Sequence, residues 1–133
     1  MTETFGCLID PEIHIPEDAS KVNNIYDEDV KGAYKIEQVL PEFLKFCEGS
    51  IMVSYVIGFD FNFILNNANT LGYIVNNETL DAFVLAKERV KGVKNYKLTT
   101  VAKFLEINLE NAHRATNDAV ATAEVMIKLL KKN

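Results

Sequence analysis

The sequence predicts an α/β domain, because apolar segments of strand length alternate with segments of helical periodicity. The clearest strand is the apolar run 51–57, which leads past Gly58 into a predicted helix. The clearest helix is 119–130, where strong helix formers carry apolar residues at helical spacing. With 133 residues, the chain is long enough for one modest core, so we expect a single domain over residues 1–133.

In the first half of the chain, residues 5–9 are predicted to form a short strand that ends at Asp10-Pro11. Residues 11–26 contain two prolines and several polar residues, which is typical of a surface excursion. A helix over 36–47 follows, with Pro41 expected near the start of its main part, where a missing N–H costs little. The apolar stripe of this helix contains Ile36, Val39, Leu40, Phe43, Leu44 and Cys47.

In the second half, a helix is predicted from Asp60 to Leu71, with Gly72 as its C-terminal stop. Residues 80–86 are expected to run from a short strand into a helix that ends near Gly92. A further helix is predicted over about 99–105. The side chains of the 60–71 helix that we expect to point inward are Phe63, Ile64 and Leu71.

The composition is that of a soluble globular protein, with 48% hydrophobic and 25% charged residues. No apolar run approaches the ~20 residues of a membrane span, and we expect no signal peptide. Cys7 and Cys47 have neither metal-ligand spacing nor the number expected for a disulfide framework, so we expect reduced core residues in a cytoplasmic protein. The net charge of −5 argues against binding of long duplex by counterion release.

A polar segment, His-Arg-Ala-Thr-Asn-Asp at 113–118, stands at the start of the last predicted helix. Asp118 falls in the first helical turn, where the helix dipole favours an ionised carboxylate. His113 precedes Asp118 by five residues, so both side chains can address one site. A carboxylate beside an imidazole suits a metal ligand next to a general base. The same residues are also compatible with a solvent-exposed helix start and an incidental histidine.

A second segment, 51–64, carries Asp60 in a Phe-Asp pair that follows the apolar run. Together the two segments resemble the DEDDh 3′-to-5′ exonucleases, in particular the proofreading exonuclease of bacterial DNA polymerase III (epsilon-subunit or PolC type). The resemblance extends through CLIDPEIHIPEDASKVNNIYDEDVKGA, VLPEFLKF, TLDAFVLAKE and NYKLTTVAKFLEINLENAHRA, so it covers nearly the whole chain. It implies a ribonuclease-H-like exonuclease fold with a mixed sheet flanked by helices.

The resemblance implies roles for three residues. In the family, four carboxylates hold two divalent ions, magnesium or manganese, and a histidine activates the attacking water. Asp118 matches the last metal-binding aspartate, Asp60 matches the aspartate of the second motif, and His113 matches the general base. Two such ions about 4 Å apart stabilise both reacting oxygens of a phosphodiester. The alternative roles are a helix cap for Asp60, a surface acid for Asp118 and a loop residue for His113.

The chain departs from the family pattern in two places. Tyr55-Val56 stands where the second motif has His-Asn shortly before Phe-Asp, which replaces polar groups near the site by apolar ones. The first motif, Asp-x-Glu-Thr-Thr-Gly, is not intact. We therefore expect an N-terminally truncated fold without its first two strands, with weak binding of at least one ion and very low intrinsic activity.

Two segments are candidates for replacing the first motif. The opening MTETFG places Glu3 on the glutamate of the motif and Met1 in the place of its aspartate. Alternatively, Asp10 and Glu12 form an Asp-x-Glu pair, although Pro11 between them indicates a turn.

The expected truncation leaves the strands 5–9 and 51–57 without their usual neighbours, and an exposed strand edge recruits partners. One solution is direct parallel pairing of these two strands through the helix at 36–48, a permitted right-handed crossover. The other solution is pairing across a homodimer.

Two functions are compatible with these observations. The first is a 3′-to-5′ exonuclease domain of the DNA polymerase III proofreading type, which hydrolyses phosphodiester bonds at the 3′ ends of single-stranded DNA with magnesium or manganese. The second is a non-catalytic remnant that binds a polymerase partner or a strand end. The partners implied are a single-stranded 3′ end and the catalytic subunit of DNA polymerase III, without a membrane.

Overall fold

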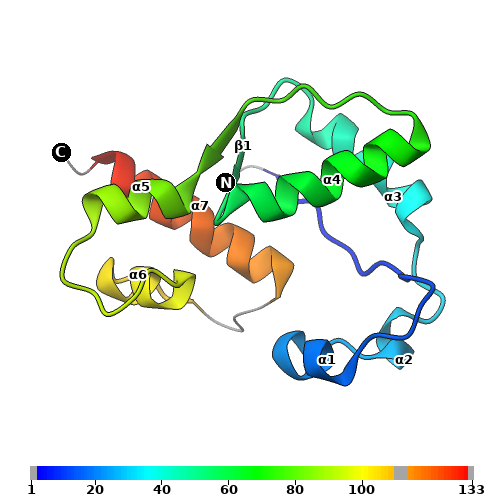
Figure 1. Ribbon diagram of the computed structural model, residues 1–133, viewed down its shortest axis with the longest axis horizontal. Coiled ribbons are helices and arrows are strands. Elements are labelled where there is room, and N and C mark those ends of the chain that lie inside the picture. Colours follow the sequence, from blue (N-terminus) through cyan, green and yellow to red (C-terminus); the bar gives the residue numbers. More distant parts are fainter. Residues whose placement is uncertain (1–2, 110–113, 132–133) are drawn as a thin grey trace.

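The computed structural model describes residues 3–109 and 114–131 of the chain (Figure 1). In this part of the chain, helices alternate with short strands, as predicted for an α/β domain. The elements are α1 (Glu17–Asn23), α2 (Asp27–Val30), α3 (Ile36–Cys47), β1 (Met52–Ser54), α4 (Ile57–Leu71), β2 (Thr79–Asp81), α5 (Ala82–Arg89), α6 (Leu98–Phe104) and α7 (Ala115–Lys131).

Strands β1 and β2 form a parallel two-stranded sheet, in which Met52 lies opposite Thr79 and Ser54 lies opposite Asp81. Helix α4 makes the crossover between the strands and contacts both of them. Helices α5 and α7 also contact β1. The sheet therefore supports both α4 and α7.

The strand predicted over 51–57 is shorter and less buried than expected. It has three residues because Val56 adopts a left-handed conformation, with φ 63°, and the chain enters α4 at Ile57. Met52 is buried, whereas Val53 is exposed. A strand that is covered on only one face leaves the side chains of its other face in contact with solvent, including apolar ones.

The strand predicted over 5–9 is not formed. This segment is extended, and its only ladder contact among the described residues is a parallel bridge between Ile9 and Tyr34. The Phe5 ring packs instead on two aromatic rings of α3, with centroid distances of 5.8 Å to Phe43 and 5.6 Å to Phe46. Direct pairing of the segments 5–9 and 51–57 is therefore wrong for the described chain, because the aromatic face of α3 takes up the N-terminal segment.

Helices α3 and α4 agree largely with the sequence prediction. α3 covers the predicted range, but Pro41 lies inside it, in the second turn, where its missing N–H leaves a helix carbonyl without its usual partner. α4 begins three residues before Asp60, and Gly72 ends it with φ 83° as expected. The expected inward side chain Phe63 is 61% exposed, because no described element covers that face of α4.

The densest packing lies between α5, α6 and α7, which Figure 1 shows side by side. The buried cluster there consists of Ala86, Val90, Val101, Ala102, Ile107, Val125 and Leu129. Polar contacts close its border: the Arg89 guanidinium donates to the Leu129 carbonyl at 2.6 Å, and the Tyr96 hydroxyl donates to the Val90 carbonyl at 2.7 Å. These three helices form the rigid part of the molecule.

Both cysteines carry free thiols. Cys47 is half-buried, but Cys7 is exposed, so the expectation of two core cysteines is wrong for Cys7, whose segment joins no sheet. None of the helices in the described part of the chain combines the length and the apolar character needed to cross a membrane.

Candidate functional site

Asp60 lies in the first turn of α4, directly after the turn that leaves β1. The Ser54 hydroxyl, at the end of β1, donates a hydrogen bond to Asp60 Oδ2. The carboxylate is exposed and stands at the positive end of the helix dipole, where a negative charge is favoured. Asp60 thus has the position expected of a ligand that follows a strand.

Asp118 lies in the first turn of α7 and is half-buried, as the sequence predicted for its position in the helix. Its backbone N–H donates to the Arg114 carbonyl at 2.9 Å. Both α4 and α7 contact β1, so the same strand supports the helices that carry Asp60 and Asp118. His113 lies outside the described residues.

The structure adds a carboxylate that the sequence reasoning missed. Asp81 ends β2 opposite Ser54, and its Oδ1 accepts hydrogen bonds from the N–H of Val56 at 3.0 Å and of Phe83 at 2.9 Å. The first bond holds the turn before Asp60, and the second caps α5. Asp81 could have been found from the sequence, because an aspartate between a short strand and a helix is typical of a helix N-cap.

The turn before Asp60 is strained. Val56 has φ 63° and ψ 64°, a left-handed conformation that a β-branched residue seldom adopts, whereas asparagine adopts it more readily. In the resembled family, asparagine stands at this place of the second motif. The turn conformation would suit asparagine better than valine, and the bond from the Val56 N–H to Asp81 helps to hold it.

Tyr55 does not replace the polar side chain of the family pattern at the site. Its hydroxyl donates to the Tyr96 carbonyl, and its ring meets Phe83 edge-on with centroids 5.6 Å apart. Burial raises the pKa of Tyr55 to about 12, and the negative charge of Asp81 adds to the shift. Tyr55 is therefore a neutral packing residue that ties the end of β1 to the segment before α6.

The candidate replacements for the first motif have different surroundings. Glu3 is exposed, and it precedes Gly6, where an added Cβ would meet the Thr116 hydroxyl at 2.7 Å. The N-terminal segment therefore passes close to the first turn of α7, which carries Asp118. This proximity is compatible with Glu3 as a neighbour of the site.

Asp10 and Glu12 are engaged in local contacts. Asp10 Oδ1 accepts a hydrogen bond from the Glu12 N–H at 2.9 Å, which is the turn that Pro11 indicated, and Glu12 forms an ion pair with Lys35 at 3.7 Å. Both line a surface hollow of about 400 Å³ together with His14 and residues of α2. Neither Asp60 nor Asp118 lines this hollow.

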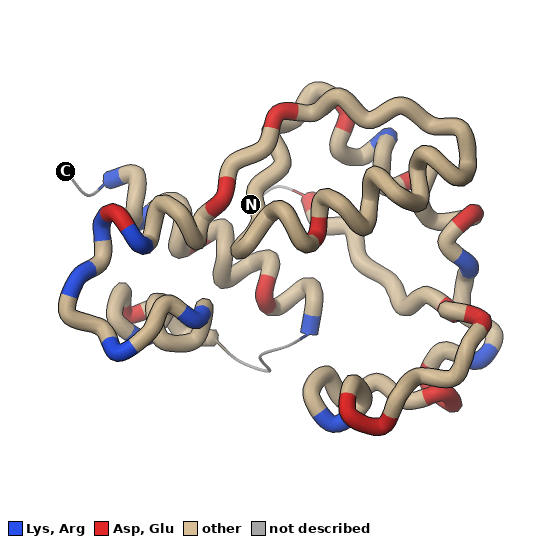
Figure 2. Tube along the Cα trace, in the orientation of Figure 1, with Lys and Arg blue, Asp and Glu red and all other residues tan. Residues whose placement is uncertain are grey.

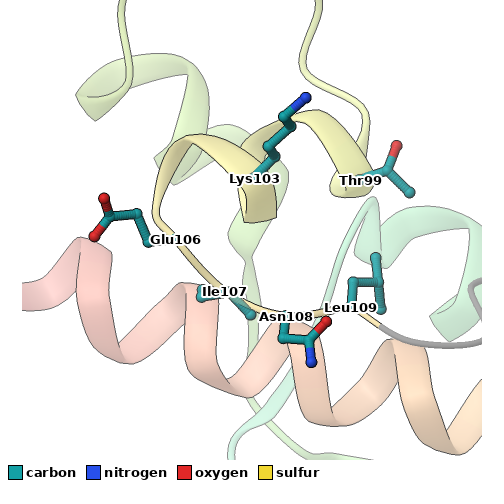
Figure 3. A pocket seen from close by; sticks show the side chains of 6 residues that line it. All are labelled: Thr99, Lys103, Glu106, Ile107, Asn108 and Leu109. Carbon is teal, nitrogen blue, oxygen red and sulfur yellow. The ribbon is translucent and has the colours of Figure 1, made fainter.

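A second hollow, of about 390 Å³, lies between α6 and the segment that follows it (Figure 3). Its lining residues are Thr99, Lys103, Glu106, Ile107, Asn108 and Leu109. In Figure 3, Lys103 points away from α7, whereas Ile107 and Asn108 lie next to that helix. Asp60 and Asp118 do not line this hollow either, so neither cavity marks the predicted site.

The metal-ligating side chains of the described residues do not amount to a complete two-ion site. Within residues 3–109 and 114–131, no group of three or more His, Cys, Asp or Glu side chains is arranged to hold a metal ion. Asp60 is bonded to Ser54, and Asp81 is occupied by two backbone N–H groups. The carboxylates that are described are therefore spread around the end of the sheet rather than gathered on one point.

The sequence pattern of the Exonuclease family matches residues 1–126, which is nearly the whole chain. The chain belongs to the Exonuclease family. This membership confirms the predicted ribonuclease-H-like α/β class, with which the short parallel sheet and its surrounding helices are consistent.

Similar proteins confirm the predicted resemblance to the DNA polymerase III exonucleases. A DNA polymerase III PolC-type protein of Caldanaerobacter subterraneus subsp. tengcongensis is 42% identical over 132 residues, which cover 99% of this chain and 9% of that protein. A PolC-type protein of Clostridium perfringens is 36% identical over 132 residues, with the same shares. A DNA polymerase III subunit epsilon of Aquifex aeolicus is 35% identical over 133 residues, 99% of this chain and 66% of that protein. This member of the Exonuclease family thus spans only a small part of its PolC-type relatives.

Proposed function

We propose that the chain is a 3′-to-5′ exonuclease domain of the DNA polymerase III proofreading type, acting on the 3′ ends of single-stranded DNA with low intrinsic activity. Family membership supports the reaction class. The observation that carries the proposal is the placement of Asp60 and Asp118, each in the first turn of a helix that contacts β1. Cytoplasmic location stays a prediction.

In this proposal, Asp118 and Asp60 are the residues that hold magnesium or manganese, whose role is to offset charge on the phosphodiester. Ser54 and Asp81 are positioning residues, because one bonds the Asp60 carboxylate and the other holds the turn that precedes it. His113 takes the proton from the attacking water. The low activity follows from the first motif, which is not intact, and from the lack of a three-ligand group among the described residues.

A second candidate function is that of a non-catalytic module that binds a polymerase partner or a strand end. The observation in its favour is the same lack, among the described residues, of a three-ligand group. The catalytic subunit of DNA polymerase III is the partner that the relatives point to. A homodimer that pairs across the strand edge of the segments 5–9 and 51–57 stays a prediction as well.

The test is release of nucleotides from a 3′-labelled single-stranded oligonucleotide in manganese, with the protein in excess. We expect slow release by the natural sequence and loss of that release in Asp118→Ala and His113→Ala. A general base contributes about 10²–10⁴-fold, so the His113 variant is informative as soon as a baseline is measurable. Asp18→Ala is the matched control, because Asp18 also lies in the first turn of a helix, α1, and should leave release unchanged.

Each outcome has a distinct meaning. Rapid release by the natural sequence would show that the incomplete carboxylate set is sufficient, against the proposal of low activity. Equal release in all four proteins would reveal a contaminating nuclease. Binding of the oligonucleotide without any release would favour the non-catalytic module.

A further inference from the structure

Charge is distributed very unevenly along the chain. Residues 3–50 contain eleven carboxylates and four lysines, whereas residues 82–109 contain five lysines and Arg89 against two glutamates. Figure 2 shows the result: Lys and Arg gather at the end of the molecule formed by α5 and α6, and Asp and Glu prevail around α1 and α2. The net charge of −5 therefore conceals a positively charged surface.

This surface, called the basic face below, consists of exposed lysines on α5, on the segment after it and on α6. Its members are Lys87, Lys91, Lys94, Lys97 and Lys103. The frame beneath them is rigid, because α5 and α6 are held by the buried cluster and by the Tyr96 hydroxyl on the Val90 carbonyl. The lysine stems therefore start from fixed positions, which lowers the entropy lost on binding.

The lysines of the basic face have no acidic partners in the described part of the chain. The ion pairs that the structure records lie near the N-terminus, where Lys21 pairs with Glu17 at 3.5 Å and Lys35 pairs with Glu12 at 3.7 Å. On the basic face, Lys91 Nζ donates to the Lys87 carbonyl at 3.0 Å, and Lys87 Nζ lies 5.3 Å from the centre of the Phe83 ring. These contacts orient ammonium groups without neutralising them.

Folding explains part of this charge but not all of it. Lys87 lies in the last turn of α5, where a cation favours the helix dipole. Lys97 stands at the N-terminal end of α6, where a cation is unfavourable, and the first turn of that helix contains no acidic residue.

The predominance of lysine on the basic face indicates which kind of anion it binds. Lysine is depleted in protein–protein interfaces, which are built around an apolar and aromatic centre. Lysine side chains are instead the usual partners of phosphate groups along a nucleic-acid strand. The basic face also belongs to the same three-helix unit as Asp118, because α7 packs against α5 and α6.

We infer that the basic face binds the phosphodiester backbone of single-stranded DNA, outside the site formed by Asp60 and Asp118. The choice of DNA rests on the proposed function, whereas the binding needs neither a metal ion nor hydrolysis. The strand contact is electrostatic and independent of sequence, and it keeps a 3′ end close to a domain whose own site is weak.

The experiment is a titration of a 3′-fluorescent oligo(dT) of about twenty nucleotides with the full chain in EDTA, followed by fluorescence anisotropy between 50 and 200 mM salt. The test variant is the triple substitution Lys91→Gln, Lys94→Gln and Lys97→Gln. The matched control is Lys21→Gln, Lys31→Gln and Lys45→Gln, which removes the same charge from exposed positions of the acidic region. Circular dichroism should give the same melting midpoint for both triples.

We expect the test variant to bind about tenfold more weakly at 50 mM salt, and its plot of log K against log salt to be flatter by about 2, since each single-strand phosphate contact contributes about 0.7. The control triple should match the natural sequence. Equal weakening by both triples, or no binding by the natural sequence, would overturn the inference. Displacement of the oligonucleotide by polyglutamate at equal charge concentration would overturn it in favour of an acidic protein partner.

The readout separates this inference from the proposed function. Binding in EDTA that depends on the basic face, together with no nucleotide release in manganese, would uphold the basic face and contradict the exonuclease. Release that depends on Asp118, together with binding that is unchanged by the three lysine substitutions, would support the exonuclease and contradict the basic face.

Discussion

Helices α5, α6 and α7 surround a cluster of fully buried side chains, whereas α1, α2 and α3 bury few residues between them. The buried residues of the N-terminal region, 3–50, are Ser20, Val30, Val39 and Leu40. That region is held by exposed polar contacts, such as His14 with Asp27, and by the stacking of Phe5 on α3. Exposed ion pairs contribute little to stability. The difference indicates that the C-terminal helices set the global stability and that the N-terminal region opens first.

The same two regions differ in charge. In the N-terminal region, Lys21 and Lys35 are paired with glutamates, and carboxylates are in excess. In the segment 82–109, lysines are unpaired with acids among the described residues, and the fold beneath them is the most rigid of the molecule. A densely packed surface with uncompensated positive charge is suited to binding an anion, whereas the N-terminal region carries an excess of negative charge.

The largest effect is expected from one leucine truncation made in each region. Leu129 is 0% exposed in the C-terminal cluster, and Leu40 is 3% exposed on α3. Leu129→Ala should lower the free energy of unfolding by about 2–5 kcal/mol, because it creates a cavity in a close-packed core. Leu40→Ala should cost less, because its surroundings can collapse. Urea unfolding measures both, and an equal loss would show that the two regions share one core.

An intermediate effect is expected where the two regions touch. An added Cβ at Gly6 would meet the Thr116 hydroxyl at 2.7 Å; because both residues are exposed, that side chain can turn aside, and Gly6→Ala should cost about 0.5–1.5 kcal/mol. Thr116→Ala removes the atom in the way, and the double variant should regain most of the loss. Thermal unfolding of the four proteins of this cycle gives the coupling energy. Full additivity would mean that the N-terminal segment does not lie on α7.

The smallest effect is a pH dependence of opposite sign in the two regions. Tyr55 has its pKa raised by burial to about 12, above the ordinary value of about 10. Below pH 10 its contribution to stability is complete, and it is lost as the pH rises towards 12, because the unfolded chain releases the proton first. The stability difference between the natural sequence and Tyr55→Phe should therefore shrink between pH 10 and 12 in urea unfolding.

Asp27 is the counterpart in the N-terminal region. The N–H of Ile15 and the side chain of His14 hold the pKa of Asp27 below its ordinary value. Its contribution is present above a pH of about 4 and is lost on acidification. Asp27→Asn should flatten only the acid side of the stability profile, and Tyr55→Phe should flatten only the alkaline side. A change of both sides in either variant would contradict the assignment.

Local patterns accounted for most helices of this protein. Helix α3 follows from its apolar stripe, α4 ends at Gly72 because glycine tolerates a positive φ, and α7 follows from helix formers after a polar segment. Membership of the Exonuclease family was also evident from sequence, because its motifs are contiguous segments. The positions of Asp60 and Asp118 in first helical turns are likewise local properties.

Only the tertiary structure decided which apolar segments become strands and which charges remain uncompensated. The segment 5–9 has the pattern of a strand, but a strand forms only when a neighbouring strand supplies hydrogen bonds. The Phe5 ring packs instead on the rings of Phe43 and Phe46 of α3. Asp81 became the support of the turn before Asp60 through parallel pairing of β1 with β2. The basic face depends on α5 and α6 both packing against α7. Contacts between residues far apart in the chain leave no local period, so a sequence read alone does not contain them.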